Sequence, residues 1–159
     1  MLSPDIQKAL TPKLNSKLLI ITVGNELRCD DGVGPYIAQV FPDGVNKNIC
    51  LINAGQHPEN FLDQAVGINP DKIVIIDAAD FQGQSGECRL FVTNNIPEKT
   101  LTTHIFPLKA IAKILEEDTK ASIFFLGIQA ESVELGQIMS EFVKKSANEI
   151  IDFLNSQHI

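Results

Sequence analysis

Residues 18–34 read LLIITVGNELRCDDGVG, and this stretch decides the fold class. Residues 18–23 form an almost unbroken apolar run, which predicts a strand that is buried on both faces of its sheet. Residues 32–41 then place apolar side chains at every fourth position, which favours a helix. A buried strand that is followed by an amphipathic helix is typical of α/β domains.

The same alternation of strand and helix patterns continues along the chain. Further buried strands are predicted at 49–54, 72–77 and 122–128, and further helices at 107–117, from Pro58 and from Ser140. Residues 87–92 alternate polar and apolar side chains after a short connection, which predicts an antiparallel edge strand. We therefore expect one three-layer α/β domain over residues 17–159, preceded by an N-terminal arm at residues 1–16. Its mostly parallel, twisted sheet should have about five strands and helices on both faces.

The composition narrows the class of partner. The 159 residues carry a formal net charge of −7, so the phosphate backbone of a nucleic acid would be repelled. No stretch is long and apolar enough to span a bilayer, and the N-terminal segment lacks the apolar part of a secretory signal. The three cysteines match no metal or redox spacing and suit a reducing compartment. We expect a cytoplasmic monomer with no nucleic-acid or membrane partner.

Candidate chemistry lies in the loops after the strands, because ligands of open α/β sheets bind beyond the carboxyl ends of the strands. Asp30 and Asp31 follow the first strand, and Asp77 ends the third. If these two strands are neighbours, as in the common doubly wound order, the carboxylates of Asp31 and Asp77 need a cation or a shared proton. Together with His104 they would form a three-ligand site with open positions, which suits a divalent metal.

Each of these residues also has a simpler structural interpretation. An Asp before a helix can cap it, and we assign Asp30 to helix capping or loop structure. Asp77 could be an ordinary turn residue, and a histidine in a loop is often only hydrogen-bonded or solvated. His57 and His158 remain alternatives to His104 as the imidazole of the site.

Three further polar residues border the same loops. Asn25 follows the glycine at the end of the first strand and is either a turn residue or a substrate-binding residue. Gln129 and Glu131 follow the last predicted strand. They are either solvated loop residues or contacts to the substrate.

Four segments, taken in order, resemble the nickel–iron hydrogenase maturation endopeptidases. They are G-N-x-L-x-x-D-D-G-x-G at 24–34, I-D-A at 76–78, T-H-x-x-P-L at 103–108 and F-L-G-I-Q at 125–129. The likeness is to the type that serves the large subunit of hydrogenase 3, and E-S-V-E-L-G at 131–136 also fits it. The resemblance extends from the first strand to the last helix.

The resemblance implies an endopeptidase that removes the C-terminal extension of a hydrogenase large-subunit precursor after nickel insertion. It implies that the substrate presents the nickel and that the enzyme holds no tight cofactor of its own. The metal ligands and catalytic residues of the family carry over to Asp31, Asp77 and His104. Two departures are Ala130, where a proline often follows G-I-Q, and Cys29, a potential soft ligand that we treat as incidental.

Two other functions have to be weighed against this one. A nucleotide-binding α/β module without protease activity would use the glycine-rich loop after the first strand to hold phosphates. The chain has no G-x-G-x-x-G directly after that strand and no P-loop lysine, and two acids stand where phosphates would lie. A metallopeptidase with its own zinc is the third interpretation, but the chain offers no H-E-x-x-H helix.

Overall fold

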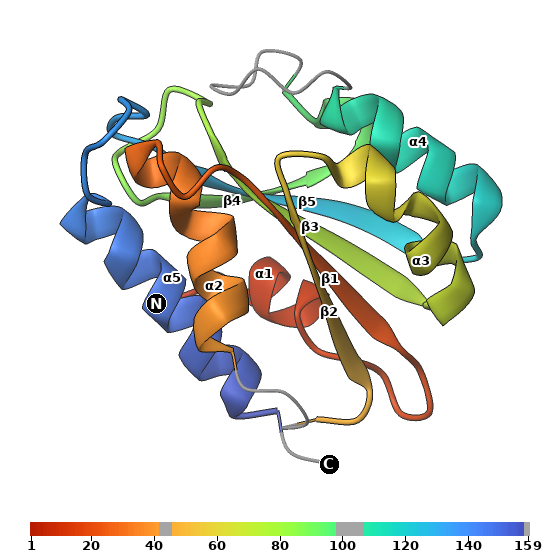
Figure 1. Ribbon diagram of the computed structural model, residues 1–159. Helices are drawn as coiled ribbons and strands as arrows, with labels where there is room; N and C mark the ends of the chain where they lie inside the picture. Colours follow the sequence, from red (N-terminus) through yellow and green to blue (C-terminus); the bar gives the residue numbers. More distant parts are fainter. Residues whose placement is uncertain (42–45, 98–106, 158–159) are drawn as a thin grey trace.

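Figure 1 shows a five-stranded sheet through the middle of this computed structural model, which describes residues 1–41, 46–97 and 107–157. The strands lie in the order β2-β1-β3-β5-β4, and their bounds are β1 Leu18–Val23, β2 Ile49–Gly55, β3 Lys72–Ala79, β4 Cys88–Val92 and β5 Ser122–Gln129. β1 is parallel to β2 and β3, β3 is parallel to β5, and β4 runs antiparallel to β5 at the edge. This arrangement confirms the predicted fold class.

Helices cover both faces of the sheet (Figure 1). One face carries α1 (Pro4–Ala9), α2 (Val33–Val40) and α5 (Glu141–Asn155), and the other carries α3 (Leu62–Ile68) and α4 (Leu108–Asp118). Short 3-10 turns are η1 (Cys29–Gly32), η2 (Pro58–Phe61) and η3 (Thr93–Asn95). The helix predicted from Pro58 thus begins as η2 and continues as α3. No helix in the described part of the chain is both long and apolar enough to cross a membrane.

Alternate residues of the central strands supply two separate cores. Leu18 and Ile20 of β1 pack toward α2 and α5, whereas Leu19 and Ile21 pack toward α3 and α4. Successive side chains of a strand point to opposite faces, so a strand between two helical layers needs apolar residues at every position. The almost unbroken apolar runs of the sequence follow from this packing.

The N-terminal segment packs onto the domain through α1. Leu2, Ile6 and Leu10 are buried in the same core as α2 and α5. The Lys72 ammonium at the start of β3 donates to the carbonyl oxygen of Lys8 over 2.9 Å. The residues that the sequence set apart as an arm therefore contribute apolar contacts to one face of the sheet.

Two glycines let η1 and α2 lie close to the end of β1. Gly24 has φ +147°, and a Cβ added there would lie 2.0 Å from the carbonyl oxygen of Asp31. A Cβ added at Gly34 would lie 2.3 Å from the carbonyl oxygen of Val23. Because only glycine avoids both contacts, the glycines of this segment hold Asp31 at the carboxyl edge of the sheet.

Candidate active site

Asp31 lies in η1, directly beyond the carboxyl end of β1, and only 1% of it is exposed. Its Oδ2 accepts a hydrogen bond from the main-chain N–H of Asn25 over 3.0 Å. The side-chain oxygen of Asn25 accepts in turn from the N–H of Leu27 over 2.9 Å, which closes an Asx turn. Asn25 therefore acts as a turn residue that helps to place Asp31, and its contact with a substrate stays a prediction.

Asp77 is fully buried near the carboxyl end of β3, opposite Gly127 of β5. β1 and β3 are hydrogen-bonded neighbours, as predicted, and η1 packs against β3. The fold thus brings the elements that carry Asp31 and Asp77 into contact at one end of the sheet. Burial penalises the charged form of each carboxylate, and either a cation or a shared proton would relieve this penalty.

The third predicted ligand, His104, lies outside the described residues, as does His158. Over residues 1–41, 46–97 and 107–157, no group of three His, Cys, Asp or Glu side chains could hold a metal ion. His57 follows β2 and is half exposed, and its Nδ1 lies 3.2 Å from the Glu59 carboxylate. The three-ligand site of Asp31, Asp77 and His104 therefore stays a prediction.

Asp30 is fully buried and links η1 to the loop that precedes α5. Its Oδ2 accepts hydrogen bonds from the N–H of Glu131 over 2.8 Å, the N–H of Ser132 over 3.1 Å and the hydroxyl of Ser140 over 2.8 Å. Its Oδ1 accepts from the N–H of Ser140 over 2.7 Å. Four donors converge on one carboxylate, so Asp30 has a structural role in joining the two segments.

The helix-capping alternative for Asp30 is wrong. Neither η1 nor α2 has a side-chain hydrogen bond at its N-terminus, so the acid pair does not cap the helix that follows it. Ser140 does precede α5, but its hydroxyl donates to Asp30 and makes no capping bond. The alternative assignment of Asp30 to loop structure is confirmed.

Cys29 is also engaged within the protein. It is buried, and its Sγ donates to the carbonyl oxygen of Ile138 over 3.1 Å. Burial raises the pKa of the Cys29 thiol, and the nearby charge of Asp30 raises it further. The bond to Ile138 engages this sulfur within the protein, so Cys29 stays an incidental residue of the site.

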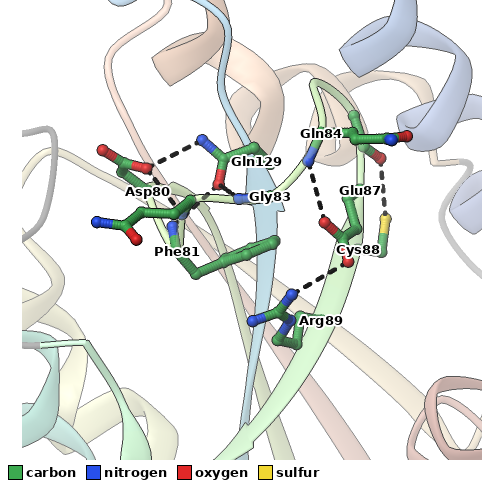
Figure 2. A network of polar contacts seen from close by, with 10 residues as sticks. Asp80, Phe81, Gly83, Gln84, Glu87, Cys88, Arg89 and Gln129 are labelled. Atoms are coloured by element: carbon green, nitrogen blue, oxygen red, sulfur yellow. Dashed lines mark hydrogen bonds and ion pairs between the residues drawn. The ribbon is translucent and has the colours of Figure 1, made fainter.

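Gln129, at the carboxyl end of β5, faces the loop between β3 and β4 in Figure 2. Its Oε1 accepts from the N–H groups of Phe81 and Gly83 over 2.9 and 3.1 Å. Its Nε2 donates to the carboxylate of Asp80 over 3.2 Å and to the carbonyl oxygen of Ala130 over 3.1 Å. The buried amide thus shapes the loop that follows Asp77. Direct contact between Gln129 and a substrate stays a prediction.

The same loop is fixed at its far end by Glu87 and Arg89 (Figure 2). Glu87 accepts from the N–H of Gln84 and from the Arg89 guanidinium, each over 3.1 Å. The guanidinium carbon of Arg89 lies 4.4 Å from the centre of the Phe81 ring, a cation–π contact. The loop beside the carboxyl end of β3 therefore has a defined shape.

Comparison with known proteins assigns the family. A family model described as hydrogenase maturation protease matches residues 38–157. The chain belongs to this family. Over 94% of each chain, the protease is 35% identical to a predicted hydrogenase maturation protease of Methanocaldococcus jannaschii. It is 31% identical to the hydrogenase 3 maturation protease of Escherichia coli, over 83% of this chain and 85% of that one.

The solved structures agree with this assignment. The crystal structure of the [NiFe] hydrogenase maturation protease HycI from Thermococcus kodakarensis matches the protease with a TM-score of 0.82 and 25% identity, over 95% of this chain and 96% of that one. The resemblance drawn from the sequence motifs is confirmed, and the chain is a peptidase of hydrogenase maturation. A nucleotide-binding module without protease activity no longer accounts for it.

Three of the four motif segments of this maturation protease lie within the described residues, and they gather at one end of its sheet. The segment 24–34 runs from the end of β1 through η1 into α2, 76–78 lies in β3, and 125–129 ends β5. β1, β3 and β5 are parallel and adjacent, so their carboxyl ends point the same way. Most of the segment 103–108 lies outside the described residues, and α4 begins at its last residue.

The contacts that organise this end of the protease could not be found from the sequence patterns. The partners of Asp30 come from residues 131–140, and Gln129 bonds to residues 80–83. The only local signal for Asp30 was the presence of two adjacent acids where a single Asp would serve as a cap. Glu131, predicted to bind substrate, is exposed beside this network, and its N–H donates to Asp30.

Proposed function

We propose that this protease removes the C-terminal extension of a [NiFe] hydrogenase large-subunit precursor after nickel has been inserted. Asp31, Asp77 and His104 bind the nickel ion that the precursor presents. The observation that carries the proposal is the burial of Asp31 and Asp77 on contacting elements, at the edge of the sheet where the motif segments 24–34, 76–78 and 125–129 lie.

The chemistry of the proposed ligands suits such an ion. Two carboxylates and one imidazole offer oxygen and nitrogen donors, which bind borderline divalent metals. Three protein ligands leave coordination positions for donors of the precursor. The similarity to the E. coli hydrogenase 3 maturation protease and to the T. kodakarensis [NiFe] hydrogenase maturation protease supports a precursor of this class as the substrate.

The metal in this proposal belongs to the substrate, which separates it from a metallopeptidase with its own zinc. A peptidase that relies on a resident metal loses activity when that metal is removed. An enzyme that recognises nickel on the precursor does not, because each new substrate molecule brings an ion.

We therefore expect purified protease to contain no stoichiometric zinc or nickel. Treatment with EDTA followed by desalting should leave its rate on nickel-loaded precursor within about twofold of the untreated enzyme. Metal content is measured by plasma mass spectrometry and cleavage by the intact mass of the precursor. Stoichiometric zinc, with loss of activity on EDTA treatment and recovery on adding zinc back, would favour the resident-metal mechanism.

A further inference from the structure

Hydrogen bonds join two loops beside the candidate active site. We call their combined surface the two-loop platform and define it as residues 25–31 and 130–140. In Figure 1 the segment after β1 and the loop after β5 lie side by side at one end of the molecule. Besides the bonds to the Asp30 carboxylate, four hydrogen bonds of 2.9–3.2 Å connect the two loops. Their donors and acceptors are Asp30 N and Ser132 O, Gly136 N and Leu27 O, Arg28 Nε and Val133 O, and Cys29 Sγ and Ile138 O. Hydrogen bonds thus connect the two loops of the platform at several points.

Three large apolar side chains of the platform are exposed to solvent. Leu27 is 64% exposed, Leu135 74% and Ile138 90%. Single exposed apolar residues are ordinary, but these three lie on two loops that hydrogen bonds join, and we call them the apolar group. The Gly136–Leu27 bond brings the main chain beside Leu135 to Leu27, and the Cys29–Ile138 bond joins the main chain of Ile138 to the same turn. A partner that covers this group removes apolar surface from water, which makes binding more favourable.

Charge restricts the partner that could cover it. The platform contains five carboxylates and one guanidinium. Glu26, Glu131 and Glu134 are exposed around the apolar group. A complementary partner therefore presents an apolar patch bordered by lysine or arginine side chains.

The platform is continuous with the candidate active site. Asp31 belongs to its first segment, and the neighbouring Asp30 bonds to its second. A macromolecule seated on the platform would therefore lie beside the carboxylates proposed to bind nickel.

We propose that the two-loop platform docks the folded body of the precursor, through an apolar patch with a basic border next to its nickel site. The inference rests on the proposed function. It adds that recognition extends beyond the nickel and the cleaved segment, and that it uses Leu27, Leu135 and Ile138.

The test compares two double variants on nickel-loaded, tail-bearing precursor. Leu135→Ser with Ile138→Ser removes platform contacts, whereas Leu14→Ser with Val92→Ser removes two other exposed apolar groups from elsewhere. We expect the platform variant to raise KM about tenfold, with kcat within about twofold of wild type. The control variant should match wild type in both constants. All of the changed side chains are exposed, so both proteins should keep the wild-type Tm.

A second measurement addresses charge. Raising the salt concentration should lower kcat/KM for the wild-type enzyme, and Glu26→Gln with Glu134→Gln should weaken this dependence. Equal KM values for the platform variant and wild type would overturn the docking proposal while wild-type cleavage still upheld the proposed function. If wild type neither binds nor cuts the precursor, both fail. A wild-type dimer that becomes monomeric in the platform variant would show that a second copy occupies the surface instead.

Discussion

Asp31→Ala, Asp77→Ala and His104→Ala should each lower the rate of precursor processing by about a hundredfold or more. Each change removes one of the three proposed ligands, and the remaining two cannot fix the geometry of the nickel ion. The fold should survive, because removing one of two carboxylates buried at the same end also removes a desolvation penalty. In Asp31→Ala the Asn25 N–H keeps its bond to the carbonyl oxygen of residue 31, which is 3.1 Å long.

The measurement is the initial rate of mass loss from nickel-loaded precursor, with circular dichroism and thermal melting as checks of the fold. His57→Ala is the matched control for His104→Ala, because His57 is half exposed and pairs with the nearby Glu59. It should process precursor at the wild-type rate. Near-wild-type rates for any two of the three ligand variants would place the site elsewhere.

Asp30 precedes Asp31, but Asp30→Ala should mainly lower the stability of the fold and not the rate of processing. The substitution leaves the N–H groups of Glu131, Ser132 and Ser140 without the carboxylate that they now share. Hydrogen bonds to a charged group contribute about 1.5–3 kcal/mol each, and the exposed loop lets some of the donors reach water. We therefore expect a loss of about 3 kcal/mol or more in the free energy of unfolding, and a Tm lower by roughly 6–12 °C.

Ser140→Ala is the graded control for Asp30→Ala, because it removes the hydroxyl and keeps the Ser140 N–H bond to Asp30. It should cost about 1 kcal/mol. At a temperature where Asp30→Ala is still folded, it should process precursor faster than Asp31→Ala does. A wild-type Tm for Asp30→Ala, or a folded Asp30→Ala protein that is less active than Asp31→Ala, would contradict these roles.

The central strands β1, β3 and β5 could be predicted from sequence because they are almost wholly buried, and β4 could be predicted because its polar and apolar side chains alternate. The run 18–23 matches β1 residue for residue. The predicted ends of β3 and β5 were too early, since the strands reach Ala79 and Gln129. Those last residues pair with each other across the two strands, and hydropathy alone does not reveal where such pairing stops.

Only the part of the site that follows from the order of the strands could be predicted from sequence. Once the first and third strands are taken as neighbours, Asp31 and Asp77 fall at the same edge, and the structure shows this. The role of Asp30 could not be predicted, because its partners are 101–110 residues away in the sequence. Gln129 likewise bonds to a loop 46–49 residues earlier. Contacts of this range depend on the folded arrangement of two loops and leave no periodic pattern.

The central claim is that the protease cuts only a precursor that already carries nickel, because Asp31, Asp77 and His104 bind that ion. The most direct measurement incubates the purified enzyme with one precursor in nickel-loaded and nickel-free forms and follows both by intact mass. The account predicts that the loaded precursor loses its C-terminal extension while the nickel-free precursor keeps its full mass. Cleavage of both forms at equal rates would contradict it.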